Sequence, residues 1–191
     1  MAVDRKQMIV DAATKSFSMF GYKATTMDQV AKLAKVGKGT IYTFYKNKED
    51  LFDEIITSLI SEMKAAAEEA MDANLTFYGN AERALFKLLE FRQDHQLMIK
   101  LLQEEKEMGT PLVSEVIQRL ENVIVSYIKG IVQKAIDKGE IKDCDPEITA
   151  FVMLNLYITL IFEWEKYHEP LEKDEISRLF TLYMFEGLSK R

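Results

Sequence analysis

Apolar residues recur every three or four positions along most of this chain. The first such stripe comprises Ile9, Ala12, Ala13, Phe17 and Phe20. This spacing places apolar side chains on one face of an α-helix, and glycine commonly follows a helix end. The stripe is followed by Gly21, and the chain holds only three prolines. The pattern therefore predicts an all-α protein whose first helix ends near Gly21.

Two short helices are predicted next. Thr26 and Gln29 have the spacing of a capping box, in which the Thr26 hydroxyl accepts from the Gln29 backbone N–H and the Gln29 side chain reaches back. A second helix should therefore begin near Met27. After a turn at residues 35–37, Ile41 and Tyr45 share the apolar face of a third, brief helix.

Longer helices fill the rest of the chain. Asn47 is a good N-cap for a fourth helix, because Glu49 and Asp50 then lie in the first turn, where the helix dipole favours negative charge. The polar stretch 72–80 ends its pattern. Glycines and prolines separate the later helices, which makes about nine in all. They are expected at about 80–94, 96–108, 111–138, 146–168 and 174–189.

The charge of the chain is unevenly distributed. Its net charge of −6 argues against nucleic-acid binding, which needs clustered Lys and Arg to neutralise phosphates. Residues 1–50, however, hold nine basic against five acidic residues, whereas the remainder holds 16 against 26. A basic N-terminal segment in an acidic chain indicates a local site for a polyanion.

Catalytic and metal chemistry are poorly supported. Cys144 is the single cysteine, which excludes an intramolecular disulfide, and together with His95 and His168 it has no zinc-ligand spacing. We therefore expect no metal, no cofactor and no enzymatic activity.

Export and membrane insertion are also not expected. The most apolar run, 148–162, is interrupted by Asn155 and Thr159 and falls short of the roughly 20 residues that span a bilayer. The N-terminus has no apolar signal segment, so we expect a cytoplasmic protein.

Residues 24–51, ATTMDQVAKLAKVGKGTIYTFYKNKEDL, predict two short helices joined by a tight turn, the second beginning with small residues and a lysine. Such a helix-turn-helix can place a helix end in the major groove of DNA. In order and spacing, the first 50 residues resemble the DNA-binding half of the TetR family of transcriptional regulators. The resemblance is carried by Ile9, Ala12, Ala13, Phe17, Gly21, Tyr22, Thr25, Thr26, Val30, Ala31, Ala34, Val36, Lys38, Gly39, Thr40, Ile41, Tyr42, Tyr45, Lys48, Glu49, Asp50 and Leu51.

The resemblance implies two domains and a DNA-facing set of residues. The helix-turn-helix domain would be residues 1–46, and a helical effector-binding and dimerisation domain would be residues 47–191. It implies that phosphates are held by Thr26, Tyr42 and Lys48. The residues implied to face DNA on the recognition helix are Lys38, Gly39, Thr40, Tyr42, Thr43 and Phe44.

Side-chain chemistry supports these roles. Lys38 can reach guanine acceptors or a phosphate, and Thr26 and Lys48 lie at helix N-termini, where anions are favoured. The alternative for Lys38 and Lys48 is a solvated charge, and for Tyr42 it is an exposed ring.

Three residues depart from the family pattern. Lys35 stands where the family usually has the glycine of the turn, so a positive φ there would strain a lysine. Gly37 replaces a Ser or Thr cap, which weakens the recognition helix. Phe44 replaces a frequent histidine, so base preference at that position cannot be inherited.

The C-terminal helices resemble the family's dimer interface. The helix predicted at 146–168 is apolar almost all round, which a helix wetted on one side would not be. An ordinary core helix is the alternative. The interface is predicted to contain Phe151, Ile158, Ile161, Phe180, Tyr183 and Met184.

An effector pocket among the central helices is also implied. The chain has 10 Met and 20 aromatic residues, which favours a lipophilic ligand, although such residues more often form core. Glu104, Glu105 or Glu163 could pair with a cationic ligand, but the run 104–107, Glu-Glu-Lys-Glu, is interpreted as a solvated face. The candidate pocket residues are Phe86, Met98, Leu101, Tyr127, Asn155, Thr159 and Glu163.

These expectations combine into one hypothesis. A homodimer binds a near-palindromic double-stranded operator, with recognition helices in major grooves roughly 34–36 Å apart or a larger multiple of the helical repeat. A small effector then shifts the helix that starts at Asn47 and releases DNA. Repression is the usual outcome in the family, with activation as the alternative. The rival classes are a helical scaffold without DNA function and a small helical enzyme.

Overall fold

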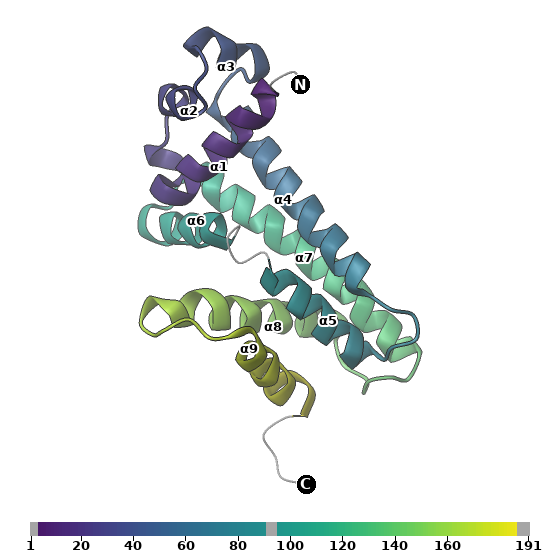
Figure 1. Cartoon of the computed structure of the whole chain (residues 1–191). Coiled ribbons are helices and arrows are strands. Elements are labelled where there is room, and N and C mark those ends of the chain that lie inside the picture. Colours follow the sequence, from purple (N-terminus) through teal and green to yellow (C-terminus); the bar gives the residue numbers. More distant parts are fainter. Residues whose placement is uncertain (1–3, 91–94, 187–191) are drawn as a thin grey trace. The chain divides into compact units, whose positions relative to one another are not determined.

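A computed structural model describes residues 4–90 and 95–186 (Figure 1). Every regular element in those ranges is helical, so the predicted all-α fold is confirmed. The α-helices are α1 (Arg5–Ala24), α2 (Met27–Leu33), α3 (Lys38–Phe44), α4 (Lys48–Ala70), α5 (Phe77–Glu90), α6 (His95–Met108), α7 (Pro111–Asp137), α8 (Pro146–Ile158) and α9 (Lys173–Phe180).

The last two α-helices continue in other helical forms. α8 passes into a π-helical segment, η1 (Thr159–Glu163), and then a 3₁₀ turn, η2 (Trp164–Lys166). α9 passes into a second π-helical segment, η3 (Thr181–Glu186). The predicted helix ends at residues 94 and 189 lie outside the described residues.

The chain divides into two compact units. The first lies within residues 1–63 and 92–118 and holds α1 to α3, most of α4, α6 and the start of α7. The second lies within residues 64–91 and 119–191 and holds α5, most of α7, and the elements from α8 onward.

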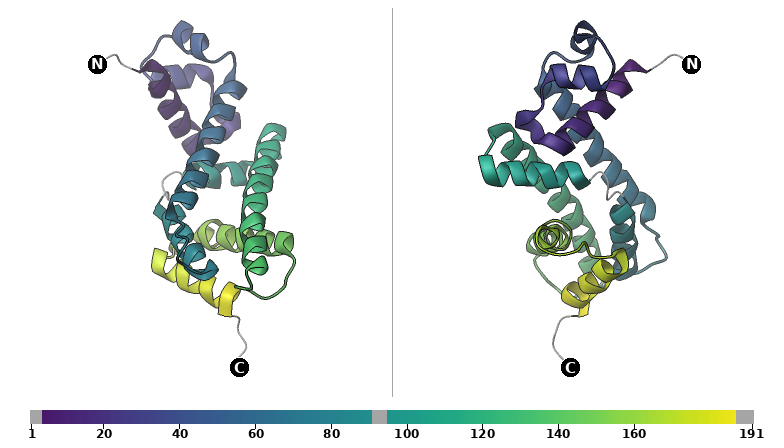
Figure 2. Two further views of the ribbon diagram at one scale, coloured as in Figure 1. Left: turned by 90° about the vertical axis from the view of Figure 1, so that its right-hand side faces the viewer. Right: turned by 60° about the vertical axis from the view of Figure 1, so that its left-hand side comes forward.

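The first unit is built around an aromatic core. Phe17 of α1, Phe52 of α4 and Tyr22 are buried, and their ring centroids lie 4.7–5.9 Å apart. Ile41 is completely buried and anchors α3. α1 also packs along α6, and the two lie side by side in both views of Figure 2. The basic N-terminal segment is thus attached to a helix that comes 70 residues later.

Local geometry confirms four expectations and corrects one. The Thr26–Gln29 capping box is present, Asn47 Oδ1 accepts from the Asp50 backbone N–H, and Gly37 makes no side-chain cap. Lys35 has a φ of +55°, the strained value expected where relatives carry glycine. Gly21, with a φ of +83°, interrupts α1 but does not end it, because a last helical turn follows to Ala24.

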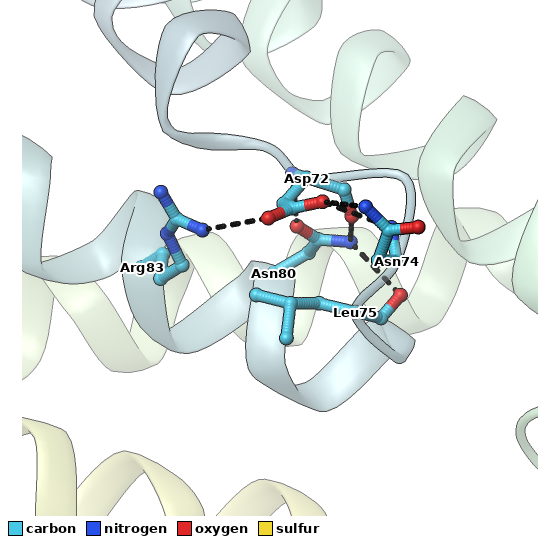
Figure 3. A network of polar contacts seen from close by, with 5 residues as sticks. All are labelled: Asp72, Asn74, Leu75, Asn80 and Arg83. Atoms are coloured by element: carbon cyan, nitrogen blue, oxygen red, sulfur yellow. Dashed lines mark hydrogen bonds and ion pairs between the residues drawn. The ribbon is translucent and has the colours of Figure 1, made fainter.

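The α4–α5 connection is a hydrogen-bonded turn (Figure 3). The Asp72 carboxylate accepts from the backbone and side-chain N–H groups of Asn74 at 2.9 and 3.0 Å and pairs with Arg83. These bonds, led by the backbone one, lower the pKa of Asp72. The Asn80 amide donates to the Asp72 carbonyl and its oxygen accepts from the Asp72 N–H. The polar stretch 72–80 therefore fixes the path between two helices.

α8 is the most apolar helix of the second unit. With η1 and η2 it forms a helical run, Pro146–Lys166, of 21 residues, long and apolar enough to cross a membrane by length and composition alone. The predicted apolar run, 148–162, lies inside this helix, which continues beyond it at both ends. It buries Ala150, Met153, Leu154 and Tyr157, as a core helix does.

Replacing Lys35 with glycine should stabilise the protein. A non-glycine residue in the left-handed region costs about 1 kcal/mol, so Lys35→Gly should raise the free energy of unfolding by about 0.5–1 kcal/mol. Lys15→Gly, on an exposed position inside α1, is the matched control and should lower it by about 1 kcal/mol. Urea unfolding followed by circular dichroism measures both. Equal losses for the two variants would show that Lys35 carries no strain.

Candidate nucleic-acid interface

The recognition helix α3 has one buried and one open face. Ile41 points into the core, whereas Lys38, Tyr42 and Phe44 are exposed. Gly39 and Thr43 are exposed too, and Thr40 is half-buried. Six of the eight residues predicted to contact DNA therefore lie on a single short helix, with two aromatic rings open to a partner.

The remaining two predicted DNA contacts differ in exposure. Thr26 is exposed at the N-terminus of α2, where its hydroxyl accepts from the Gln29 backbone N–H at 3.3 Å. Lys48 is half-buried at the start of α4. Its ammonium donates to the carbonyls of Tyr22 at 2.8 Å and Thr25 at 2.9 Å. Burial lowers the pKa of Lys48, against the opposing influence of nearby carboxylates. Lys48 thus holds the turn between α1 and α2, and its phosphate contact stays a prediction.

A second charged residue holds the same turn. Glu104 of α6 is only 3% exposed, and its carboxylate accepts from the backbone N–H of Lys23 at 3.1 and 3.2 Å. It also accepts from the Thr110 hydroxyl at 2.9 Å. A Cβ built on Gly21 would overlap Glu104 Oε2, so a larger residue there would displace this carboxylate in addition to straining the backbone.

The interpretation of residues 104–107 as a solvated face was wrong for Glu104. Leu97, Leu101 and Glu104 follow one another at i, i+4 and i+7, and all three are buried. That spacing was the available signal, because it places Glu104 on the inner face of α6. Its partner, the Lys23 N–H, lies 81 residues away and cannot be read from the pattern.

Further bonds complete the turn at residues 21–25. The Thr25 hydroxyl donates to the Gly21 carbonyl at 2.8 Å and lies 3.1 Å from Ser16 Oγ. The Tyr22 hydroxyl donates to Glu49 at 3.0 Å, and burial together with that carboxylate raises the pKa of Tyr22. The turn that leads into α2, and so into the helices predicted to face DNA, is therefore fixed by residues of α1, α4 and α6.

The predicted effector residues fall in both units. Met98 and Leu101 belong to α6 in the first unit, with Leu101 fully buried. In the second unit Phe86 lines a cavity of about 430 Å³ between α5 and the α9–η3 segment. Tyr127 is half-buried, and the set on the α8–η1 run is exposed: Asn155, Thr159 and Glu163. Their common role as a pocket stays a prediction.

The predicted dimer residues also separate by exposure. Phe151 and Tyr183 are exposed, and Ile158 and Met184 are half-buried. Ile161 and Phe180 are buried within the single chain.

Removing the Glu104 carboxylate should weaken both folding and DNA binding. Glu104→Ala leaves two donors of part-buried hydrogen bonds, the Lys23 N–H and the Thr110 hydroxyl, without their acceptor, which should lower the free energy of unfolding by about 1–2 kcal/mol. Glu107→Ala, at an exposed position of the same helix, is the control and should change it by less than about 0.5 kcal/mol. Urea unfolding and DNA affinity are measured for both. Equal stability of the two variants would contradict the assigned contacts.

Comparison with known proteins identifies the family. Residues 9–55 match the pattern of the family described as "Bacterial regulatory proteins, tetR family". The chain is 62% identical over 189 residues to the uncharacterized HTH-type transcriptional regulator YhgD of Bacillus subtilis (strain 168), with 99% of each chain covered. It is 31% identical over 145 residues to the fatty acid metabolism regulator protein of the same strain, covering 71% of this chain and 70% of that one.

Solved structures share the fold. The transcriptional regulator FadR from Bacillus subtilis, in complex with stearoyl-CoA, matches with a TM-score of 0.82 and 21% identity over 96% of this chain and all of that one. The fatty acid degradation regulator FadR from Bacillus halodurans matches with a TM-score of 0.80 and 16% identity over the whole of both chains. This chain belongs to the tetR family of bacterial regulatory proteins, and it is a DNA-binding transcriptional regulator rather than an enzyme.

Proposed function

We propose that this regulator is a homodimeric repressor that leaves a near-palindromic operator when a lipophilic effector binds. The observation that carries the proposal is the exposed face of α3. This helix is anchored by the buried Ile41, and the turn that precedes α2 is held by residues of α1, α4 and α6. Two copies would place their recognition helices in major grooves roughly 34–36 Å apart, or a larger multiple of the helical repeat. Such a regulator works where the chromosome is, in the cytoplasm.

The proposed effector is a long-chain acyl thioester. A relative with 31% identity is named a fatty acid metabolism regulator, and a structure with the same fold holds stearoyl-CoA. The chain's 10 Met and 20 aromatic residues suit an apolar chain, because thioether and ring side chains adapt to irregular apolar shapes. The candidate lining residues remain those predicted from the sequence.

Two helices are in position to carry the effector's influence to the DNA-facing elements. α4 contributes Lys48 and Glu49 to the turn at residues 21–25, and it continues into the second unit. α6 contributes Glu104. A shift of either helix would move main-chain atoms just before α2. The size of the response is limited by the difference in effector affinity between the DNA-bound and free conformations.

The homodimer is supported by the outer face of α8. Ile148 is 63% exposed, Phe151 47% and Val152 45%, and these three share one side of the helix at i, i+3 and i+4. Contiguous exposed apolar residues of this kind mark an interaction surface. Phe151 and Tyr183 are the predicted interface residues that a second copy could reach most readily.

Stearoyl-CoA tests the effector. The wild-type protein is bound to a labelled duplex from upstream of its own gene, and fluorescence anisotropy is followed as stearoyl-CoA is added. We expect release of the DNA by stearoyl-CoA and none by coenzyme A alone, because the apolar chain supplies the differential binding. An unchanged anisotropy with both compounds would overturn the acyl-effector proposal while leaving DNA binding intact.

A charge on α8 tests the dimer. Phe151→Glu should convert the 22.1 kDa chain to a monomer at micromolar concentration and weaken operator binding, because a carboxylate would be buried unpaired in the interface. Leu75→Glu, on the exposed α4–α5 turn, is the control and should leave the mass at that of a dimer. Light scattering coupled to size exclusion measures both. A monomeric wild type would contradict the proposed interface.

A further inference from the structure

A carboxylate lies on the DNA-facing side of the motif, in contact with the recognition helix. Asp28, in the first turn of α2, accepts a hydrogen bond from the ammonium of Lys38 at 2.9 Å. The two side chains are 55% and 67% exposed. The hydrogen bond with Asp28 raises the pKa of Lys38. Neither the family resemblance nor the proposed operator contact assigns a role to Asp28.

The pair contributes little to folding, because an exposed ion pair is screened by water and carries an entropic cost. The effect of the pair is on the orientation of the Lys38 side chain. Lys38 is the first residue of α3, where the helix dipole disfavours a cation, and Gly37 provides no side-chain cap. The Asp28 carboxylate offsets that unfavourable charge and restricts a long, flexible side chain to one orientation.

The same carboxylate opposes DNA. A carboxylate beside a polyanion is repelled unless a cation neutralises it, and Lys38 is the cation that the structure places on Asp28. If Lys38 leaves to bind a phosphate, Asp28 is exposed to that repulsion. If Lys38 stays, two of its three ammonium protons remain for other acceptors.

We propose that Asp28 is a specificity-determining residue, which directs Lys38 to base acceptors in the operator and penalises its use on phosphates. Guanine presents two adjacent acceptors, O6 and N7, in the major groove, which match the two remaining protons. On the operator the pair stays together and Asp28 stays neutralised. On other DNA sequences, Lys38 either makes no contact with the DNA or breaks its ion pair with Asp28 to bind a phosphate. The inference rests on the proposed function, since it requires an operator.

The test compares two duplexes of equal length in the full-length protein: the segment that wild type protects upstream of its own gene, and a scrambled version. Asp28→Asn should raise affinity for the scrambled duplex about fivefold, since one unit charge near a phosphate is worth about 1 kcal/mol in water. Operator affinity should change less than about twofold, so discrimination falls. The salt dependence on scrambled DNA should steepen by about one phosphate contact.

Two controls separate this role from a general charge effect. Glu62→Gln removes an exposed carboxylate that bonds Ser58, 14 residues beyond Lys48 and so about 20 Å along α4. It should leave discrimination unchanged. In a Lys38→Ala background, Asp28→Asn should no longer lower discrimination, because the side chain it directs is absent.

The outcomes are distinct. A fall in discrimination that depends on Lys38 supports the inference. Equal gains on both duplexes, or no change on either, overturn it and leave the proposed function standing. A wild type that protects no sequence would overturn both.

Discussion

Charged side chains bond the main chain of the last turn of α1 and of Thr25, and the position of the helices predicted to face DNA depends on these bonds. Glu104 accepts from the Lys23 N–H, while Lys48 donates to the Tyr22 and Thr25 carbonyls. Hydrogen bonds in which one partner is ionised are stronger than bonds between neutral groups. The start of α2, and through it α3, is placed by this arrangement.

The second turn of the motif is held much less firmly. Lys35 adopts a strained backbone conformation, and Gly37 gives α3 no side-chain cap. Lys38, which is predicted to face DNA, contacts α2 through an exposed ion pair with Asp28. The motif therefore combines a first turn bonded by charged side chains with a helix α3 that is anchored by Ile41 but has no side-chain cap.

Much of this architecture could be predicted from periodicity and local chemistry. The helix positions, the Thr26 cap and the strain at Lys35 depend on neighbouring residues, so the sequence contains them. The buried position of Glu104 was not predicted, because the charged run that contains it resembles a solvated face and its partner is a distant backbone N–H. Lys48 was correctly placed at a helix start, but the carbonyls that engage it come from the end of α1 and the loop after it. Tertiary contacts of this kind leave no local pattern.

Prediction from the sequence was limited in a similar way for the C-terminal helices. Spacing placed Phe151 and Ile161 on one nearly uniform apolar helix, and only the packing separates an exposed ring from a buried side chain. Asn155 and Thr159 share a face as their spacing requires, yet periodicity does not decide whether that face looks inward. The change from α-helix to the π-helical η1 begins at Thr159, one of the two polar residues that interrupt the apolar run, and has no other sequence signal that we could identify.

The central claim is that the open face of α3 binds DNA, and a salt-titrated affinity measurement with Tyr42→Ala tests it most directly. For wild type, the logarithm of the binding constant for the upstream duplex should fall linearly with the logarithm of salt concentration, because phosphate contacts release counterions. Tyr42→Ala should weaken binding about tenfold without lowering stability, since the ring is exposed. A wild-type binding constant that does not change with salt concentration, or a Tyr42→Ala variant that binds as tightly as wild type, would contradict the account.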